Sequence, residues 1–486
     1  MSNVDAAVPP VPQARPHPAG SSGARPAGRR GVNLTEGDSH RQILGLAGYM
    51  MLGSVATMTF QLADAYFVSQ LGTHELAALA FTFPVVMILH AISIGLGTGV
   101  TAVVARIFGK GDFAQAKVLT TDSILLAFAI ALVFAVIGHA SMDTLFRTLG
   151  AGPDILPLVE SYMDVWYYGM PFMVVPLIAN AVIRAFGDAK FPSLIMATTA
   201  VINIILDPIL IFGVAVIPGL GLQGAAIALL ISRLITLIAS LFILHHRIHA
   251  LDYRLPTMAR LKDSWSQLLH IGLPATGTQL ITPVSSAILT SLVASFGATA
   301  VAAYGVVTRI EMFSLIFIMA LSISIAPFVG QNAGAGRMDR VSEALSFCYK
   351  AALAYGLVIF AILWFVGRTI ASEFSSVPEV LDVAGFYLSV VPISYGCMGL
   401  LNVSSGALNA LARPMPAMVI GVSKSLVVQI PFAYTGAYLW GIRGVFIGMA
   451  ASTVVVATMA FILARRAVAA GPGPTRGRPG RGMVLS

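Results

Sequence analysis

The chain has 486 residues, of which 57% are hydrophobic and 10% are charged, and its formal net charge is +8 at pH 7. Soluble domains average about 25% charged residues, so this composition excludes an ordinary soluble domain and predicts a protein that crosses a membrane many times. The two cysteines, Cys348 and Cys397, lie in or beside apolar stretches, which excludes a disulfide framework and a cysteine metal site.

Twelve apolar spans predict an all-α membrane protein, because they are too long for barrel strands. Residues 1–40 are rich in Pro, Ala, Gly, Ser and Arg and are expected to form a disordered tail, as are residues 468–486. Between the tails we expect an N-terminal six-helix lobe at 41–245, a loop at 246–264 and a C-terminal six-helix lobe at 265–467. The spans lie at about residues 43–69, 77–106, 121–145, 160–186, 191–214, 222–245, 265–295, 299–331, 342–367, 380–411, 415–437 and 443–465.

Basic residues occur mainly in every second loop. The loops on the other side of the predicted bundle carry only Arg147, Arg368 and Arg443. Cytoplasmic loops are enriched in Lys and Arg, so the two tails and the loop at 246–264 are expected to be cytoplasmic. The basic loops contain Arg106, Lys110 and Lys117; Arg184 and Lys190; Arg247, Arg254, Arg260 and Lys262; Arg337 and Arg340; and Arg413.

The second half of the sequence repeats the first at a near-constant offset. Gly109 and Gly111 fall on Gly334 and Gly336, in each case in a short loop after a long span. We call the separation of Gly109 from Gly334 the repeat offset. One repeat offset contains six spans. An even number of spans gives both halves the same orientation, so a pseudo-two-fold axis along the membrane normal relates them. This plan predicts an alternating-access transporter with a cavity between or within the lobes.

Three polar residues within the spans are candidates for an ion site. Asp64 is an isolated acid in the first span, where a charge at mid-bilayer costs about 3 kcal/mol or more. In the fifth span Asn203 and Asp207 are four residues apart and share a helix face, and Pro208 frees a backbone carbonyl near Ile204. These oxygens predict a Na⁺ site or a proton relay. The alternative is a purely structural role in holding helices together.

The acids of this candidate site have no equivalents in the second half. The repeat offset places Leu289 opposite Asp64, and residues 383–486 contain no acid to match Asp207. The ion chemistry is therefore expected only in the N-terminal lobe.

Five motifs stand in order between about residues 40 and 465: Q-L-A-D-A-Y-F-V-S-Q-L-G-T-H-E-L-A-A-L-A, A-R-I-F-G-K-G-D, N-A-V-I-R-A-F-G-D-A-K, I-N-I-I-L-D-P-I-L-I-F-G and P-F-V-G-Q-N-A-G-A-G-R. Together they resemble the MATE (multidrug and toxic compound extrusion) transporters, and most of all their damage-inducible, DinF-like bacterial branch. The resemblance implies efflux of organic cations across the bacterial cytoplasmic (inner) membrane, driven by inward flow of H⁺ or Na⁺. It also implies coupling at a first-helix acid and a fifth-helix Asn and Asp, which are Asp64, Asn203 and Asp207 in this chain.

The chain departs from the family pattern in two places. Where relatives often have a proline in the first helix this chain has Tyr49, and the C-terminal counterpart of that position is Pro274. A proline-driven bend of the first helix is therefore not expected. Another branch uses acids on helices 7 and 10, but here helix 7 has Gln279 and helix 10 has only Asp382, near its outer end. Coupling by that pattern is not expected either.

Four residues are candidates for the substrate cavity: Gln61, Tyr66, Gln279 and Glu311. Arg309 and Glu311 are two residues apart and do not share a face, so each is expected to pair with another group. The pairing either holds helices together or, for Glu311, is a contact with a bound cation. Arg233 and Lys424 are expected to snorkel or to pair across helices.

Two rival functions stay open at this point. A lipid-linked oligosaccharide or peptidoglycan-precursor flippase would use cations such as Arg233, Arg309 and Lys424 to bind pyrophosphate. A membrane enzyme is disfavoured, because the chain has no H-E-x-x-H, no G-x-S-x-G and no Cys/His cluster. The expected partners are small organic cations and the lipid bilayer, not nucleic acid. We expect a monomer with no cofactor beyond the coupling ion.

Overall fold

The computed structural model of this protein describes residues 31–214 and 217–473, and helices dominate both ranges. The N-terminal half contains α1 (Ser39–Ser69), α2 (Thr73–Gly109), α3 (Phe113–Thr148), α4 (Leu156–Tyr168), α5 (Met170–Ala185), α6 (Lys190–Phe212), the hairpin β1 (Gly213–Val214) and β2 (Ile217–Pro218), α7 (Gly221–Phe242) and the π-helix η1 (Ile243–Ile248). The C-terminal half contains α8 (Met258–Ala294), α9 (Ala298–Ser314), α10 (Ile316–Gly334), α11 (Met338–Ser372), α12 (Pro378–Val390), η2 (Val391–Ser394), α13 (Tyr395–Ala410), α14 (Pro414–Val422), η3 (Ser423–Val427) and α15 (Gln429–Ala469).

Within the described ranges ten helical segments are long and apolar enough to cross a membrane, and the bent pair α4–α5 makes eleven. The last of the ten, Pro414–Ala469, is divided by a kink into two helices, so the predicted fold class is confirmed. Several spans are built from two or three elements. α4 and α5 form one span bent by 50°, because Pro171 lies at the start of α5 and has no N–H with which to continue α4. α15 contains two spans, which separate at the non-helical residues Trp440 and Gly441. The spans expected to be continuous at 160–186, 299–331 and 380–411 are each interrupted.

The helix ends follow the sequence repeat. α1 and α8 end at Ser69 and Ala294, and α2 and α10 end at Gly109 and Gly334, so the repeat offset separates both pairs. α2 and α10 also contact each other reciprocally. A Cβ on Gly109 would lie 2.0 Å from the carbonyl oxygen of Gln331, and a Cβ on Gly334 would lie 2.0 Å from that of Arg106. Such exchanged contacts are what two-fold symmetry produces at an interface.

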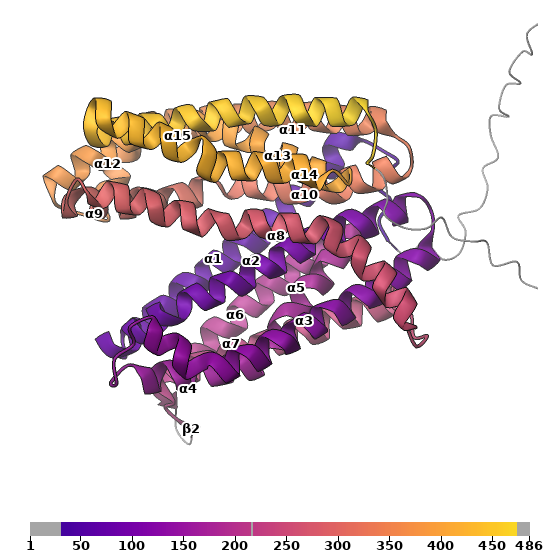
Figure 1. The fold of residues 1–486 in the computed structure, drawn as a ribbon, viewed down its shortest axis with the longest axis horizontal. Helices are drawn as coiled ribbons and strands as arrows, with labels where there is room; N and C mark the ends of the chain where they lie inside the picture. Colours follow the sequence, from indigo (N-terminus) through magenta and orange to yellow (C-terminus); the bar gives the residue numbers. More distant parts are fainter. Residues whose placement is uncertain (1–30, 215–216, 474–486) are drawn as a thin grey trace, which may run out of the picture. The chain divides into compact units, whose positions relative to one another are not determined.

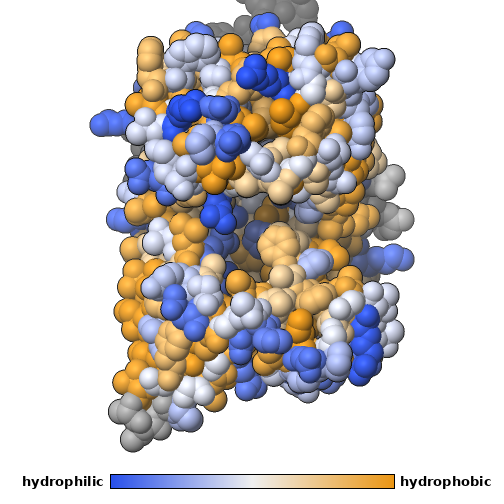
Figure 2. All heavy atoms as spheres, turned by 90° about the vertical axis from the view of Figure 1, so that its left-hand side faces the viewer, coloured by the Kyte–Doolittle hydropathy of each residue, from blue (hydrophilic) through white to orange (hydrophobic). Residues whose placement is uncertain are grey.

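The helices of the two halves gather in two groups (Figure 1). α1–α7 form one group and α9–α15 form the other, with α8 running between them. Figure 2 looks onto the face at which α4, α9 and α12 lie in Figure 1. This face is hollowed between the two groups, and hydrophilic side chains lie inside the hollow. The C-terminal ends of α2 and α10 are in close contact through Gly109 and Gly334. This contact closes the hollow on the side of these helix ends, which we call the closed side.

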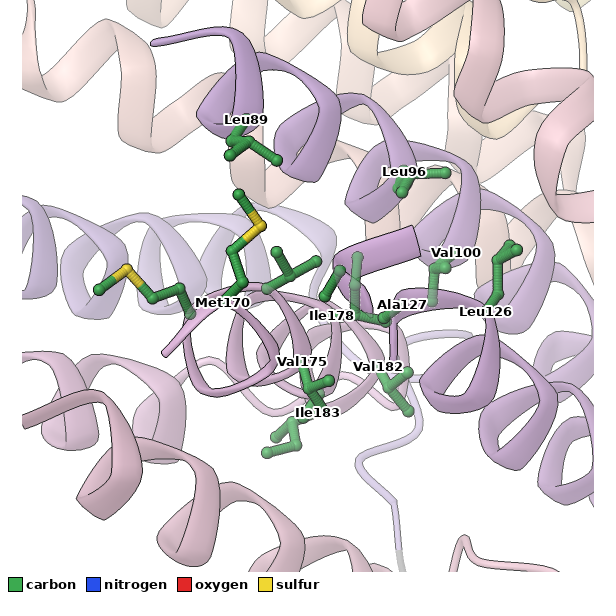
Figure 3. Close-up of a cluster of buried hydrophobic side chains, with 14 of the residues drawn as sticks. Leu89, Leu96, Val100, Leu126, Ala127, Met170, Val175, Ile178, Val182 and Ile183 are labelled. Carbon is green, nitrogen blue, oxygen red and sulfur yellow. The ribbon is translucent and has the colours of Figure 1, made fainter. Parts of the chain in front are cut away.

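Buried aliphatic side chains of α2, α3 and α5 form the core of the N-terminal half (Figure 3). Val175, Ile178 and Val182 recur on α5 at spacings of three and four residues, which places them on one face of the helix. They meet Val100 of α2 and Leu126 of α3 in the same cluster. α5 also packs against α7, and α7 contacts both α4 and α6.

The segment Gly31–Asp38 connects the two halves on the closed side. Val32 donates its backbone N–H to the carbonyl of Phe186 at the end of α5, and the backbone N–H of Leu34 donates to Gln331 of α10 at 3.0 Å. Leu34 is only 2% exposed. The prediction of a disordered tail through residue 40 is therefore wrong for residues 31–40, because the polar composition hid the backbone hydrogen bonds that hold this segment. The rest of that predicted tail lies outside the described residues.

Asp38 ends the segment and caps α1. Its carboxylate accepts a hydrogen bond from the backbone N–H of Arg41 at 2.7 Å. This bond holds the pKa of the exposed Asp38 carboxyl below its usual value.

The link between the halves is shorter and more ordered than the predicted loop at 246–264. η1 continues α7 to Ile248, and α8 already begins at Met258. Buried Asp122 of α3 accepts hydrogen bonds from Arg260 at 2.9 Å and from Ser264 at 2.6 Å, and Arg260 also pairs with Asp252 at 2.9 Å. The ion pair and the hydrogen bonds offset part of the cost of burying the Asp122 carboxylate. They also connect the link and the start of α8 to α3.

Candidate functional site

α6 positions the first two residues of the candidate ion site. Asn203 and Asp207 lie on its buried face, 2% and 0% exposed, and the Asn203 amide donates to Asp207 Oδ1 at 3.2 Å. Helical spacing of four residues makes this contact possible. α6 continues through Pro208 to Phe212, so the proline changes the helix without ending it.

α1 brings Asp64 to the same place. α1 packs along α6, and the Asp64 carboxylate lies within electrostatic range of Asp207. The hydroxyl of Tyr162, which is buried on α4, lies within electrostatic range of both acids. Three helices, α1, α4 and α6, therefore contribute polar groups to one site inside the N-terminal half.

The site has unused capacity to accept hydrogen bonds. Within residues 31–214 and 217–473, Asn203 Oδ1 and Asp207 Oδ2 are buried without a hydrogen-bond partner. No Lys or Arg side chain of the described chain forms an ion pair with Asp64 or Asp207. Buried polar oxygens are normally paired, so these atoms mark a place for a donor or a cation. Oxygen ligands of this kind fit H⁺ or Na⁺.

A pair of hydroxyl groups extends the candidate ion site from α6 toward α7. Thr199 lies one turn before Asn203, and its hydroxyl lies 3.1 Å from that of Thr236 on α7. Thr236 also donates to the carbonyl of Ser232. The three α6 residues Thr199, Asn203 and Asp207 therefore form one polar line, four residues apart, along one face of α6.

Tyr162 is a site residue that the sequence-based prediction missed. The sequence does contain a signal for it, because the repeat offset places Tyr162 on another tyrosine, Tyr387. Identical aromatic residues with a hydroxyl at equivalent positions of the repeat would have drawn attention to both halves. Their different surroundings become visible only in the folded chain.

The candidates for the substrate cavity are scattered. Gln61 lies three residues before Asp64, on the same side of α1, and is exposed. Tyr66 is 62% exposed and lies two residues after Asp64, about 200° around the helix, so the structure does not bring it to the acids. Gln279 is half-buried in α8. Glu311 accepts a hydrogen bond from buried Tyr387 at 2.7 Å and is held within the C-terminal half.

Glu311 and Lys424 do pair with groups on other helices, as predicted. Tyr387 of α12 is the partner of Glu311, and Lys424 donates to the hydroxyl of Thr453 on α15 at 2.8 Å. Arg309 is exposed and forms no ion pair with the described residues, so the prediction of a partner is wrong for this arginine, whose charge faces outward.

Comparison with known proteins adds relatives to this geometry. The family model MatE matches two segments, residues 50–209 and 274–435, one in each half. A Shewanella oneidensis protein named FAD transporter is 39% identical over 88% of this chain and 94% of its own length. A Bacillus subtilis protein named probable multidrug resistance protein YoeA is 26% identical over 84% of this chain and 89% of its own.

A solved structure agrees in fold. The crystal structure of the Vibrio cholerae MATE transporter VcmN in the bent form superposes with a TM-score of 0.84 at 29% identity. The match covers 89% of this chain and 97% of that one. The family match in both halves, the relative at 39% identity and the shared fold agree, and the chain belongs to the MATE family of membrane transporters.

Proposed function

We propose that this protein is a secondary active exporter that exchanges an organic solute for H⁺ or Na⁺ at Asp64, Asn203 and Asp207. One observation carries the proposal. Two acids from α1 and α6 converge on Tyr162 with no basic partner among the described residues, and they leave buried oxygens unpaired. Two nearby carboxylates in a medium of low dielectric constant repel each other, and an added proton or cation relieves that repulsion.

Packing of α1 supports a link between the ion and the substrate. α1 contacts α6 within the site and also contacts α10 and α11 of the other half. In the proposed cycle, ion binding from the side of the hollow neutralises the acids and changes the packing of α1, which releases the substrate. The ion then leaves on the opposite side, and the next substrate binds there. With the chain ends cytoplasmic, as the loop charges predict, the hollow of Figure 2 opens outward.

Two observations support the proposed substrate classes: the names of the relatives and the position of the Arg233 side chain. Relatives named for multidrug resistance are 24–26% identical to this chain, and the relative at 39% is named FAD transporter. Arg233 on α7 is half-buried and has no ion-pair partner in the described chain. A guanidinium binds phosphate well. We therefore place a planar, phosphate-bearing solute of the flavin-dinucleotide type beside the organic cations as the second candidate substrate.

The test is transport into proteoliposomes under separately imposed pH and Na⁺ gradients. We expect accumulation of substrate against its gradient with one of the two ions. Asp64→Asn and Asp207→Asn should each lower this rate about tenfold or more, as loss of about 1.4 kcal/mol of ion binding would. Asp143→Asn is the matched control, because Asp143 is an exposed α3 acid paired only with Arg147.

Normal gradient-driven exchange by both variants would reject the coupling site. Three probes separate the substrate classes: FAD, a fluorescent organic cation and a lipid-linked pyrophosphate. Transport of the lipid alone would favour a flippase.

A further inference from the structure

A second polar cluster lies in the C-terminal half, where half-buried Glu311 and Lys424 contact buried residues. Glu311 of α9 accepts the hydroxyl of Tyr387 at 2.7 Å, and Lys424 of η3 donates to Thr453 of α15 at 2.8 Å. The carboxylate of Glu311 and the ammonium of Lys424 lie within electrostatic range of each other, without a direct ion pair in the described chain. The tyrosine ring packs on Phe446 of α15, with ring centroids 4.9 Å apart. These residues bring together one acid and one base inside the lobe.

This cluster is the counterpart of the ion site in the N-terminal half. The repeat offset relates Tyr387 to Tyr162, and it relates Lys424 to Thr199, the first residue of the polar line on α6. The acids themselves have no counterpart, because the same offset places Leu289 opposite Asp64 and Phe432 opposite Asp207. The two halves therefore share a frame but differ in charge. One site holds two acids without a base, and the other holds one acid with a lysine.

An unpaired hydroxyl marks the C-terminal cluster as a candidate ligand site. Tyr395 is 1% exposed, and its hydroxyl has no hydrogen-bond partner among residues 31–214 and 217–473. It lies within electrostatic range of Glu311, as does Tyr304 of α9. Glu311, Tyr387 and Tyr395 thus supply oxygen atoms that could surround a small cation if Lys424 were not there.

We propose that Lys424 is a tethered counter-ion, which takes in the C-terminal half the place that an external cation takes in the N-terminal half and so keeps the Glu311 site from binding a coupling ion. The chemistry of lysine suits this role. Its ammonium is a compact point charge with three donors on a flexible stem, and one donor already goes to Thr453. The contrast with the other lobe rests on the proposed function of Asp64 and Asp207.

The proposal makes Lys424 a specificity-determining residue. With the lysine present, only the N-terminal half takes up ions. Without it, Glu311 keeps a buried charge that must be neutralised by H⁺ or Na⁺. The titratable groups that interact with Glu311 are Tyr304, Tyr387, Tyr395 and Lys424, and α15 contributes the Thr453 hydroxyl beside Lys424.

The experiment measures ion-dependent thermal unfolding of the purified full-length protein in detergent. The background is Asp64→Asn/Asp207→Asn, which removes the N-terminal acids. The midpoint is recorded from acid to alkaline pH, in NaCl or in choline chloride at the same ionic strength. We expect a midpoint that depends little on pH or on Na⁺ in the background protein. Adding Lys424→Met should lower the midpoint in choline as pH rises, and Na⁺ or lower pH should restore it by several degrees.

Two further variants keep the test decisive if Lys424→Met is simply less stable. Adding Glu311→Gln to Lys424→Met should abolish the dependence on pH and Na⁺, because the unpaired charge is gone. Lys350→Met, which removes an exposed lysine of α11, should behave like the background. The proposal is overturned if Lys424→Met shows no ion dependence, or if that dependence survives Glu311→Gln. Gradient-driven transport by the wild type is scored separately, so failure of the coupling proposal is distinguishable from failure of this one.

Discussion

At the scale of single residues, the two tyrosines Tyr162 and Tyr387 show how equal positions acquire different roles. Tyr387 donates to Glu311 at 2.7 Å, in a cluster that contains its own lysine. Tyr162 faces two acids and no base of the described chain. A hydroxyl can donate to a carboxylate or contribute an oxygen to a cation, so Tyr162 is expected to take part in ion binding.

Tyr162→Phe keeps the ring and removes only this hydroxyl. We expect the apparent affinity for the coupling ion to fall about three- to tenfold, as loss of one hydrogen bond of about 1 kcal/mol predicts. The measurement is the initial transport rate as a function of H⁺ and Na⁺ concentration. Tyr387→Phe is the matched control and should leave the ion concentration for half-maximal rate unchanged. Equal shifts in both variants would mean that the hydroxyls act only through stability.

At the scale of elements, the segment Gly31–Asp38 holds the closed side together. Gln331 accepts from the backbone N–H of Leu34 and donates to the carbonyl of Ala185 at 2.9 Å, so one side chain joins this segment to both halves. Arg340 of α11 donates to the carbonyl of Gly37 at 2.7 Å. Backbone groups buried in this way depend on their partners, because water cannot replace them.

Gln331→Ala should leave the buried N–H of Leu34 without an acceptor. We expect the free energy of unfolding to fall by about 1–3 kcal/mol, the usual cost of an unsatisfied buried group. Thermal and denaturant unfolding in detergent give the measurement. The control is Gln267→Ala, since Gln267 pairs only with the exposed Asp263 next to it on α8. A loss no larger than that of the control would show that the segment does not stabilise the fold.

At the scale of the whole transporter, the proposed cycle of alternating access requires the closed side of the hollow to open. The reciprocal contact of Gly109 with Gln331 and of Gly334 with Arg106 is a place where the backbones of the two halves lie in close contact on that side. Only glycine fits there, because any Cβ would overlap a backbone oxygen of the other half. The pseudo-two-fold axis makes both contacts equivalent, so either glycine reports on the same gate.

Gly109→Ala and Gly334→Ala should each destabilise the closed contact by about 1–3 kcal/mol through overpacking. Such a bias changes the ratio of the two conformations about 5- to 150-fold, so the hollow of Figure 2 should close more often. Spin labels at Gln70→Cys and Ser295→Cys, after replacement of Cys348 and Cys397, measure the distance across it. Gly48→Ala is the control, because nothing lies within 4 Å of a Cβ there. Unchanged distances in both variants would contradict the gate.

The sequence by itself determined the all-α membrane fold and the internal repeat, and it identified Asp64, Asn203 and Asp207 as candidate site residues. The physical reason is that a membrane makes apolar length and buried charge costly, so both leave a strong mark on composition. It did not determine that residues 31–38 are ordered, nor that α4 and α5 bend by 50° between them.

Only the tertiary structure decided which side chains meet. The convergence of Asp64 and Asp207 on Tyr162, and the sharing of one cluster by Glu311 and Lys424, depend on helices that lie far apart in the chain. Spacing along one helix can predict the pair Asn203 and Asp207, because four residues make one turn. Contacts between helices depend on packing angle and depth, which no local pattern encodes.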